Sequence, residues 1–349
     1  MTRIWVDIDN PPQAQYLSPV ARELRARGCD VLVTARDHTA TIDVLRQRGE
    51  EPHIVGSVLG ASRVAKTVGT LGRVPLLARA VVRELGRPDA VVSTARGGVL
   101  TAAALRVPAF TVLDYEGVEL AAFRWSGTTL LHPDVVPAER FTERGFPADR
   151  LVSFPGLKED LTFAGIETDL VPPAMLPPPS DPALQAVLVR PPSQTSHYRV
   201  DESVLLLGAV LDAVAPHPDL QVVFSPREPD QVALLDGRQW TNPPVVLHRP
   251  LPFVGLLKAV SWVVTGGGTM LREAAWMGVP GVTVYQGAPP AADEWLEVRG
   301  MIRRVGSPSD ASDVPWADPQ EMPTLERHPE ALSCVVALIQ GGARSVRRT

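Results

Sequence analysis

Residues 261–285 constrain the fold of this chain more than any other stretch of its sequence. An apolar, β-branched run at 260–264 stops at three glycines, and residues 269–277 then carry their apolar side chains at helical spacing. A glycine and a proline end this helical pattern, and a second apolar run follows at 281–285. The stretch therefore predicts a strand, a glycine turn, a helix and another strand, as in a parallel α/β sheet.

The glycine turn has the properties of an anion-binding site. Its glycines carry no Cβ, so the backbone can approach a ligand closely, and the N–H groups at the start of the following helix favour a phosphate. Thr269 and Glu273 share one face of that helix, which puts the Glu273 carboxylate about where ribose hydroxyls would lie. The alternative is a plain glycine-rich connection with a solvated Glu273. The predicted nucleotide site consists of Gly266, Gly267, Gly268, Thr269, Met270 and Glu273.

Length and composition limit the class of protein. A chain of 349 residues is too long for one ordinary domain, which predicts two. Its net charge of −5 argues against a nucleic-acid binder, and it has no apolar run of the ~20 residues that a membrane span needs. The sequence runs from Arg3 straight into a strand, so we expect no signal peptide and a cytoplasmic protein. Cys29 and Cys334 form neither a disulfide framework nor a metal-ligand cluster, and we expect no metal and no cofactor.

Strand and helix patterns alternate along the chain and are interrupted by a run of prolines. We expect a first α/β domain at 1–165, a Pro-rich linker at 166–182 and a second α/β domain at 183–325. Both are expected to be doubly wound Rossmann-like domains with parallel sheets, facing each other across a cleft. Residues 326–349 contain a last helix and a tail, and this helix either caps the second domain or crosses back to the first.

The first strand is followed by a polar segment at 10–13, which predicts a rigid exit loop. From this loop, Asn10 and Gln13 are expected to line the acceptor side of the cleft. Ser18 is expected to be the N-cap of the first helix, with Pro19 at the first helical position.

Acidic residues that follow strands of the first domain are the candidates for catalysis. Asp114 and Glu116 come after the strand at 109–113, where partial desolvation raises the pKa of a carboxylate and suits it to general-base work. Each could instead be a helix cap or a surface acid. Asp7 and Asp9 share one face of the first strand, an arrangement that can bind Mg²⁺, although three-residue acidic patterns are common.

Basic residues follow strands of the second domain. Arg190 stands at a strand end, where an arginine can bind a diphosphate with two hydrogen bonds, and His197 in the next segment could donate to the same group. Arg227 repeats this pattern more weakly, and an arginine on the domain surface is the alternative in each case. The chain lacks the glycine fingerprint of dinucleotide oxidoreductases after its first strand, the Gly-Lys-Ser/Thr phosphate loop and the Gly-x-Ser-x-Gly nucleophile elbow, which argues against those three classes.

Several short motifs are spread over nearly the whole chain. They are Ile-Trp-Val-Asp-Ile-Asp-Asn-Pro-Pro-Gln at 4–13, Tyr-Leu-Ser-Pro at 16–19, Val-Thr-Ala-Arg-Asp at 33–37, Asp-Tyr-Glu at 114–116, Phe-Pro-Gly-Leu-Lys-Glu at 154–159, Arg-Pro-Pro at 190–192 with His-Tyr at 197–198, and Gly-Gly-Thr-Met-Leu-Arg-Glu-Ala-Ala at 267–275. Together they resemble the family known as domain of unknown function 354. That family is similar to glycosyltransferases of the two-Rossmann B fold and to non-hydrolysing sugar-nucleotide 2-epimerases, which bind a nucleoside diphosphate sugar between their domains.

The resemblance implies that residues 267–273 hold the diphosphate and the ribose. The epimerases carry a Thr-x-His-Arg pattern at the start of their second domain, and here Leu-Val-Arg-Pro stands at 188–191, which favours transfer over epimerisation. The B-fold transferases have a glycine-rich first loop where this chain has the polar segment at 10–13, so the resemblance does not identify the acceptor.

The function that these features favour is metal-independent transfer of a sugar from a nucleoside diphosphate sugar to an unidentified acceptor. The helix N-terminus at Thr269 and the Arg190 side chain would stabilise the leaving diphosphate. Glu116 is the first candidate for the base that deprotonates the acceptor and Asp9 the second, while Asp114 could orient the loop. A sugar-nucleotide isomerase and a non-catalytic sugar-nucleotide-binding protein are the alternatives, and the sequence leaves open whether the protein is a homodimer.

Overall fold

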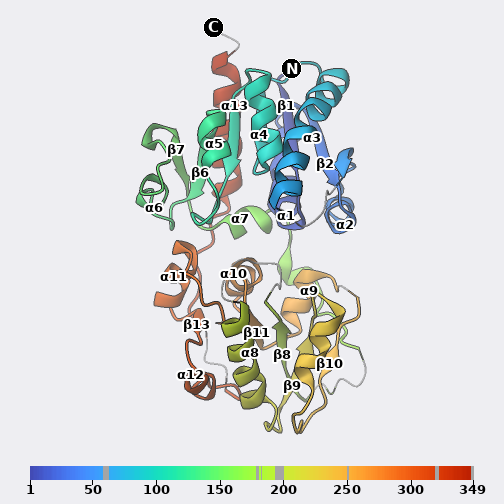
Figure 1. Cartoon of the computed structure of the whole chain (residues 1–349), viewed down its shortest axis with the longest axis vertical. Coiled ribbons are helices and arrows are strands. Elements are labelled where there is room, and N and C mark those ends of the chain that lie inside the picture. Colours follow the sequence, from blue (N-terminus) through green and yellow to red (C-terminus); the bar gives the residue numbers. More distant parts are fainter. Residues whose placement is uncertain are drawn as a thin grey trace. The chain divides into compact units, whose positions relative to one another are not determined.

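The computed structural model describes residues 1–57, 63–177, 181, 183–192, 200–249, 251–318 and 322–346 (Figure 1). The chain divides into two compact units. The first unit contains Met1–Ile166 together with Arg327–Thr349, and the second contains Glu167–Glu326. Each unit has its own parallel sheet and its own apolar core.

In the described residues, the first unit has a seven-stranded parallel sheet in the order β3-β2-β1-β4-β5-β6-β7. The order reverses between β1 and β4, so these two strands form the topological switch point, beyond whose carboxyl ends open α/β sheets bind ligands. The strands are β1 (Arg3–Ile8), β2 (Asp30–Asp37), β3 (His53–Ser57), β4 (Ala90–Ser93), β5 (Ala109–Val112), β6 (Thr129–Pro133) and β7 (Leu151–Phe154).

Helices cover both faces of this sheet (Figure 1). Ile4, Val6 and Ile8 of β1 form one face with the neighbouring strands, and the long helices α1, α2 and α13 pack their apolar residues against it. α3, α4 and α5 lie against one another on the other face, toward which Asp7 is directed. The helices are α1 (Pro11–Ala26), α2 (Thr39–Gln47), α3 (Arg63–Glu84), α4 (Arg96–Ala104), α5 (Ala121–Ser126), α6 (Glu139–Thr142), α7 (Lys158–Thr162) and α13 (Glu330–Val346), with a 3₁₀ turn, η1 (Ala148–Arg150).

α1 begins in the segment that was expected to be an exit loop. Asn10 is its N-cap, and the Asn10 Oδ1 accepts a hydrogen bond from the Gln13 N–H at 3.0 Å. The Gln13 Oε1 in turn accepts one from the Asp9 N–H at 2.8 Å, so the two side chains cap the helix start reciprocally. The prolines at the first two helical positions fit there because those positions have no helical partner for an N–H. The expectation of a loop at 10–13 is therefore wrong.

Ser18 and Pro19, expected to start this helix, lie inside it and are buried. The Ser18 hydroxyl donates to the carbonyl of Ala14 at 2.7 Å, so it bonds back along the helix instead of capping a new one. Pro19 lacks the N–H that an interior helical residue normally donates. The buried apolar stripe of α1 offsets that loss, since tertiary packing supplies most of the stability of a helix in a protein.

The C-terminal helix α13 belongs to the core of the first unit, which decides between the two alternatives left open by the sequence. Its buried side chains pack with β1, β4 and α1. Gly342 lies so close to β5 that a Cβ there would be 2.3 Å from Cζ of Phe110. The buried residues of α13 are Ala331, Val335, Val336, Ile339 and Ala343.

The second unit repeats the same architecture. Its described residues form a six-stranded parallel sheet in the order β10-β9-β8-β11-β12-β13, with the switch point between β8 and β11. α8 and α12 pack on one face, and α9 and α10 on the other. The strands are β8 (Gln185–Arg190), β9 (Leu220–Phe224), β10 (Val245–Val246), β11 (Trp262–Thr265), β12 (Gly281–Thr283) and β13 (Ile302–Arg304). The helices are α8 (Val200–Val214), α9 (Phe253–Lys258), α10 (Gly268–Trp276), α11 (Ala291–Val298) and α12 (Pro308–Ser312).

Two segments of the second unit differ from what the sequence suggests. The alternating strand and helix pattern suggests a helix at 230–235, but the segment forms a 3₁₀ turn, η3 (Pro229–Leu235). The start of the Pro-rich segment packs on α9, since the Lys258 ammonium donates to the carbonyls of Thr168 and Asp169, in the turn η2 (Thr168–Leu170), at 3.0 and 3.1 Å. None of the helices in the described part of the chain is long and apolar enough to cross a membrane.

Candidate functional site

The glycine turn of the second unit lies at the carboxyl end of β11, beside the switch point with β8. Gly267 is the N-cap of α10, and its N–H donates to the Thr265 hydroxyl at 3.2 Å. Because the N-cap is a glycine, it has no side chain with which to satisfy the first N–H groups of the helix. The start of α10 therefore lacks a side-chain cap, and anion binding at its N–H groups stays a prediction.

The three glycines are packed to different degrees. A Cβ at Gly266 would lie 2.8 Å from Cγ of Pro192, and a Cβ at Gly268 would lie 2.4 Å from Nη1 of Arg272. Of the atoms in the described residues, the nearest to a Cβ at Gly267 would be Nη2 of Arg227, at 3.6 Å. The outer two glycines are thus required by close packing, whereas the middle one is open toward an arginine.

A buried ion pair packs against the glycine turn. The Arg272 guanidinium of α10 contacts the Asp293 carboxylate of α11 at 2.5 Å, and both side chains are almost fully buried. A buried charge is strongly destabilising unless it is paired, so this ion pair fixes α10 relative to α11. The sequence contained no signal for it, because Asp293 comes from a helix that was not predicted.

Two arginines lie at the carboxyl ends of β8 and β9. Arg190 is level with Thr265 of β11 in the sheet, and its Nη1 donates to the Ser225 hydroxyl at 2.9 Å. The Nε of Arg227 donates to the Pro191 carbonyl at 3.0 Å. Burial, together with repulsion from Arg227, lowers the pKa of Arg190 to about 10. Burial also lowers the pKa of Arg227, although part of that side chain remains exposed.

Within the described part of the chain, this arrangement concentrates positive charge beside the glycine turn without an acidic partner for either arginine. The two guanidinium groups repel each other, and each is held by neutral oxygen atoms in the hydrogen bonds described above. An anion bound here would be attracted by both groups and would relieve their repulsion. Arg227, ranked below Arg190 from sequence alone, is the arginine nearer to Gly267.

The remaining predicted nucleotide-site residues lie on α10, with one exception. Thr269 and Met270 are partly exposed in its first turn, and Glu273 is buried one turn later. Thr265 and Glu273 thus flank the turn from the strand and the helix. His197 lies outside the described residues.

In the first unit, Asp7 and Asp9 are joined by arginines. Arg73 of α3 donates to both carboxylate oxygens of Asp7, at 2.8 and 3.0 Å, and lies 3.4 Å from Oδ1 of Asp9. Arg36 of β2 lies 2.7 Å from the same Oδ1. Asp7 is fully buried, whereas the Asp9 side chain is 25% exposed. The described residues hold no group of three or more acidic, histidine or cysteine side chains suited to a metal ion.

A second charged cluster lies beyond β5 and β7. The Lys158 ammonium donates to Oδ2 of Asp114 at 2.6 Å and lies 3.4 Å from Oε1 of Glu159. It also lies over the ring of Tyr16, at 5.6 Å from its centroid. Burial raises the pKa of the Tyr16 hydroxyl, which donates to Thr94 at 2.9 Å. Glu116 is close in sequence to Asp114 and buried.

The sequence named the acids of these clusters but missed their basic partners. Arg73 lies within a helix, where nothing in the local pattern distinguishes it from a surface arginine. Arg36 and Lys158 belong to the motifs at 33–37 and 154–159, which were noted only for the resemblance. Asn10 and Gln13 cap α1, as described above, and Asn10 is exposed.

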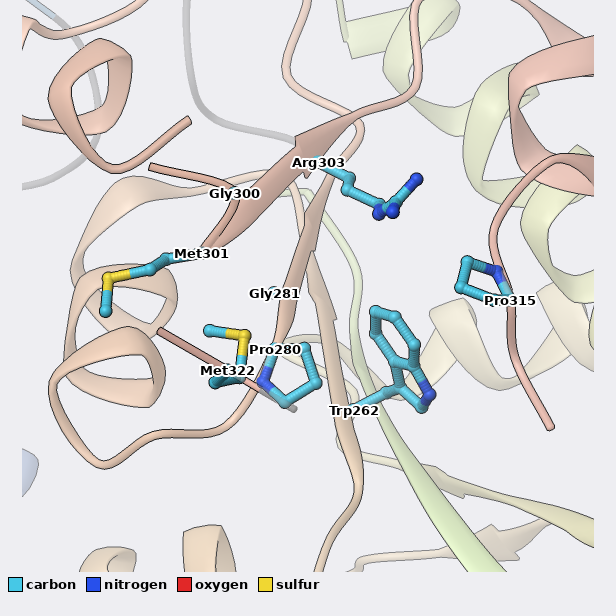
Figure 2. A pocket seen from close by; sticks show the side chains of 8 residues that line it. All are labelled: Trp262, Pro280, Gly281, Gly300, Met301, Arg303, Pro315 and Met322. Atoms are coloured by element: carbon cyan, nitrogen blue, oxygen red, sulfur yellow. The ribbon is translucent and has the colours of Figure 1, made fainter. Parts of the chain in front are cut away.

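Figure 2 shows a small pocket at the amino ends of strands in the second sheet, at the end opposite the glycine turn. Its lining includes Trp262, Gly281 and Met301, which lie at or just before the amino ends of β11, β12 and β13. Ligands of open α/β sheets bind beyond the carboxyl ends of strands, so this pocket is not part of the candidate site.

Solved structures share this fold over almost the entire chain. The UDP-GlcNAc 2-epimerase from Neisseria meningitidis bound to UDP-GlcNAc has a TM-score of 0.72 at 14% identity, covering 97% of this chain and 100% of that one. The epimerase from Methanocaldococcus jannaschii in complex with UDP-GlcNAc and UDP has a TM-score of 0.72 at 12% identity, with the same coverages of 97% and 100%. The glycosyltransferase SnogD from Streptomyces nogalater has a TM-score of 0.53 at 20% identity, covering 100% and 94%. The expected two-Rossmann B fold is thereby confirmed.

Within this fold class, the chain belongs to the family described as "Protein of unknown function (DUF354)", which it matches over residues 2–307. The match confirms the resemblance inferred from the ordered motifs. No curated protein matches the chain.

The packing of the turn predicts different effects for two neighbouring substitutions. Gly268→Ala should lower the free energy of unfolding of the second unit by about 1–3 kcal/mol, because its Cβ would overlap the guanidinium that Asp293 holds in place. Gly267→Ala is the matched control: its φ of −141° suits any residue, and its effect should stay within about 0.5 kcal/mol. Urea unfolding measures both, and equal midpoints for the two variants would contradict the packing described here.

Proposed function

We propose that the second unit binds the nucleoside diphosphate of a sugar nucleotide at the turn between β11 and α10. The observation that carries this proposal is the pair of mutually repelling arginines, Arg190 and Arg227, beside a glycine-capped helix start. A diphosphate would meet the N–H groups of Gly268 and its neighbours and both guanidinium groups. Glu273 would bind the ribose hydroxyls, and His197 could donate to the diphosphate.

The reaction that we propose is transfer of the sugar to an acceptor, without an obligatory metal ion. As the bond between the anomeric carbon and the diphosphate breaks, negative charge develops on the leaving oxygen. The N-terminus of α10 and the two arginines would stabilise that charge, which is the role of Mg²⁺ in other transferases. The acceptor hydroxyl also needs a base, and the first unit supplies the candidates Glu116 and Asp9. Asp114 is a weaker candidate because Lys158 already holds it.

The likeness to epimerases supports a second candidate, isomerisation of a sugar nucleotide. Two of the structures described above are named UDP-GlcNAc 2-epimerases, and their TM-scores of 0.72 exceed the 0.53 of the transferase. An isomerase would convert the donor without an acceptor, whereas a transferase would release free nucleoside diphosphate only with one. A third hypothesis is a protein that binds the sugar nucleotide without converting it.

Calorimetric titration with UDP, GDP and dTDP tests the nucleotide site. Wild-type protein should bind at least one of them, and Glu273→Ala should weaken that binding by ~1–3 kcal/mol, the usual effect of removing a hydrogen-bonded buried charge. Arg227→Met should also weaken it, because one of the two attracting charges is lost. Glu167→Ala, which removes an exposed acid of the same unit, is the control and should bind like wild type. Unchanged affinity in both Glu273→Ala and Arg227→Met would show that the nucleotide does not bind at this turn.

A donor screen separates the three reactions. The chain is incubated with nucleoside diphosphate sugars in EDTA, alone and with a cell extract as the source of acceptor, and free nucleotide and epimers are measured. Transfer predicts free nucleotide that depends on the extract and persists in EDTA. On that donor, Glu116→Gln and Asp9→Asn are compared, and the true base should lose ~10²–10⁴-fold in rate. Turnover that requires added Mg²⁺ would count against the metal-independent mechanism.

A further inference from the structure

The motif Val-Thr-Ala-Arg-Asp at 33–37 has no role in the function proposed so far, yet it contacts both acids of the first strand. β2 runs parallel to β1 with Asp7 level with Thr34 and Ile8 level with Ala35. The Thr34 hydroxyl donates to Oδ1 of Asp7 at 2.7 Å, and the Arg36 Nε lies 2.7 Å from Oδ1 of Asp9. Thr34 thus contacts Asp7, and Arg36 contacts Asp9.

Arg73 completes the network from the other side. Its side chain is 2% exposed, and its Nε donates to the Val55 carbonyl of β3 at 2.9 Å. With Nη1 and Nη2 bonded to Asp7, the guanidinium has a single orientation. Nη1 also lies 3.4 Å from Oδ1 of Asp9. Asp9 therefore forms ion pairs with one arginine from β2 and one from α3.

The two acids differ in what they leave available to a ligand. Asp7 is fully buried, its oxygens are occupied by Arg73 and Thr34, and a Cβ at Gly98 of α4 would lie 2.8 Å from its Oδ2. Asp9 is partly exposed, and the closest contact of each arginine is with the same oxygen, Oδ1. Among the described residues, these arginine contacts leave out Oδ2 of Asp9, and Asp9 follows the carboxyl end of β1 at the switch point.

The charges around Asp9 also suit it to proton transfer. Burial and the neighbouring Asp7 raise the pKa of Asp9, while Arg36 and Arg73 lower it. The balance leaves the pKa above its ordinary value, which brings this carboxyl closer to the pH at which a general base works best.

We propose that Arg36 and Arg73 are positioning residues that hold Oδ1 of Asp9, so that Oδ2 accepts the proton of the acceptor hydroxyl. This inference rests on the proposed transfer reaction. In that step the acceptor O–H bond breaks and its proton moves to Asp9. The acceptor oxygen bonds to the anomeric carbon, and the bond from that carbon to the diphosphate breaks, releasing the nucleoside diphosphate.

The test uses Arg36, because variants of the buried Arg73 would leave Asp7 unpaired and disrupt the first unit. Arg36→Gln should lower kcat about 10–100-fold with the KM for the donor unchanged, because the base is less well placed. It should also move the acid limb of the pH–rate profile to higher pH, since a charge that lowers the pKa of Asp9 is lost. Arg36→Lys restores the charge and should return the acid limb toward wild type. Arg46→Gln, which removes an exposed arginine 3.9 Å from Glu51, is the control and should change nothing.

A second measurement needs no donor. NMR titration of side-chain carboxyl carbons, with Asp9 assigned by its loss in Asp9→Asn, should give a higher pKa for Asp9 in Arg36→Gln than in wild type. An equal pKa in the two proteins would overturn the inference, as would an Asp9→Asn enzyme that turns over within about threefold of wild type. Failure of wild-type protein to bind UDP, GDP or dTDP would instead count against the proposed function, so the two failures are distinguishable.

Discussion

The ion pair between Arg272 and Asp293 is the interaction on which the candidate nucleotide site depends. It joins α10 to the first turn of α11, and Gly268 is packed directly on its guanidinium. Removing either partner would leave a buried charge, which typically destabilises a protein by about 3–5 kcal/mol. The turn therefore holds its shape before any ligand binds. A site organised in advance loses less conformational entropy on binding, and its N–H groups need not reorient as charge develops on a leaving group.

The two units place different charges at equivalent positions of the same fold. At the switch point of the first unit, two acids are balanced by Arg36 and Arg73. At that of the second unit, Arg190 and Arg227 repel each other. A neutral cluster with a partly exposed carboxylate suits the exchange of a proton, whereas a cationic cluster at a helix start suits a phosphate. This division matches what a glycosyl transfer requires, a base for the acceptor and an electrostatic site for the diphosphate.

Most of the fold could be predicted from the sequence, because each long helix and each buried strand shows its own pattern of apolar residues. By contrast, α5 and α7 are too short for such a pattern, and the start of α1 was misjudged because Ser18-Pro19 resembles a cap. The glycine turn was recognised because its signal is local. The basic partners were not, because Arg73 meets Asp7 across 66 residues and Arg272 meets Asp293 across 21, and nothing in a single sequence pairs such positions.

The proposed function requires that a nucleoside diphosphate binds at the turn between β11 and α10. Hydrogen–deuterium exchange of the full chain, with and without saturating UDP, tests it at the backbone itself. We expect UDP to slow exchange of the amides at 266–270, whose N–H groups would bind the diphosphate, whereas peptides at 39–47 in α2 of the first unit should exchange at the same rate in both samples. Binding of UDP with unchanged exchange at 266–270 would contradict it.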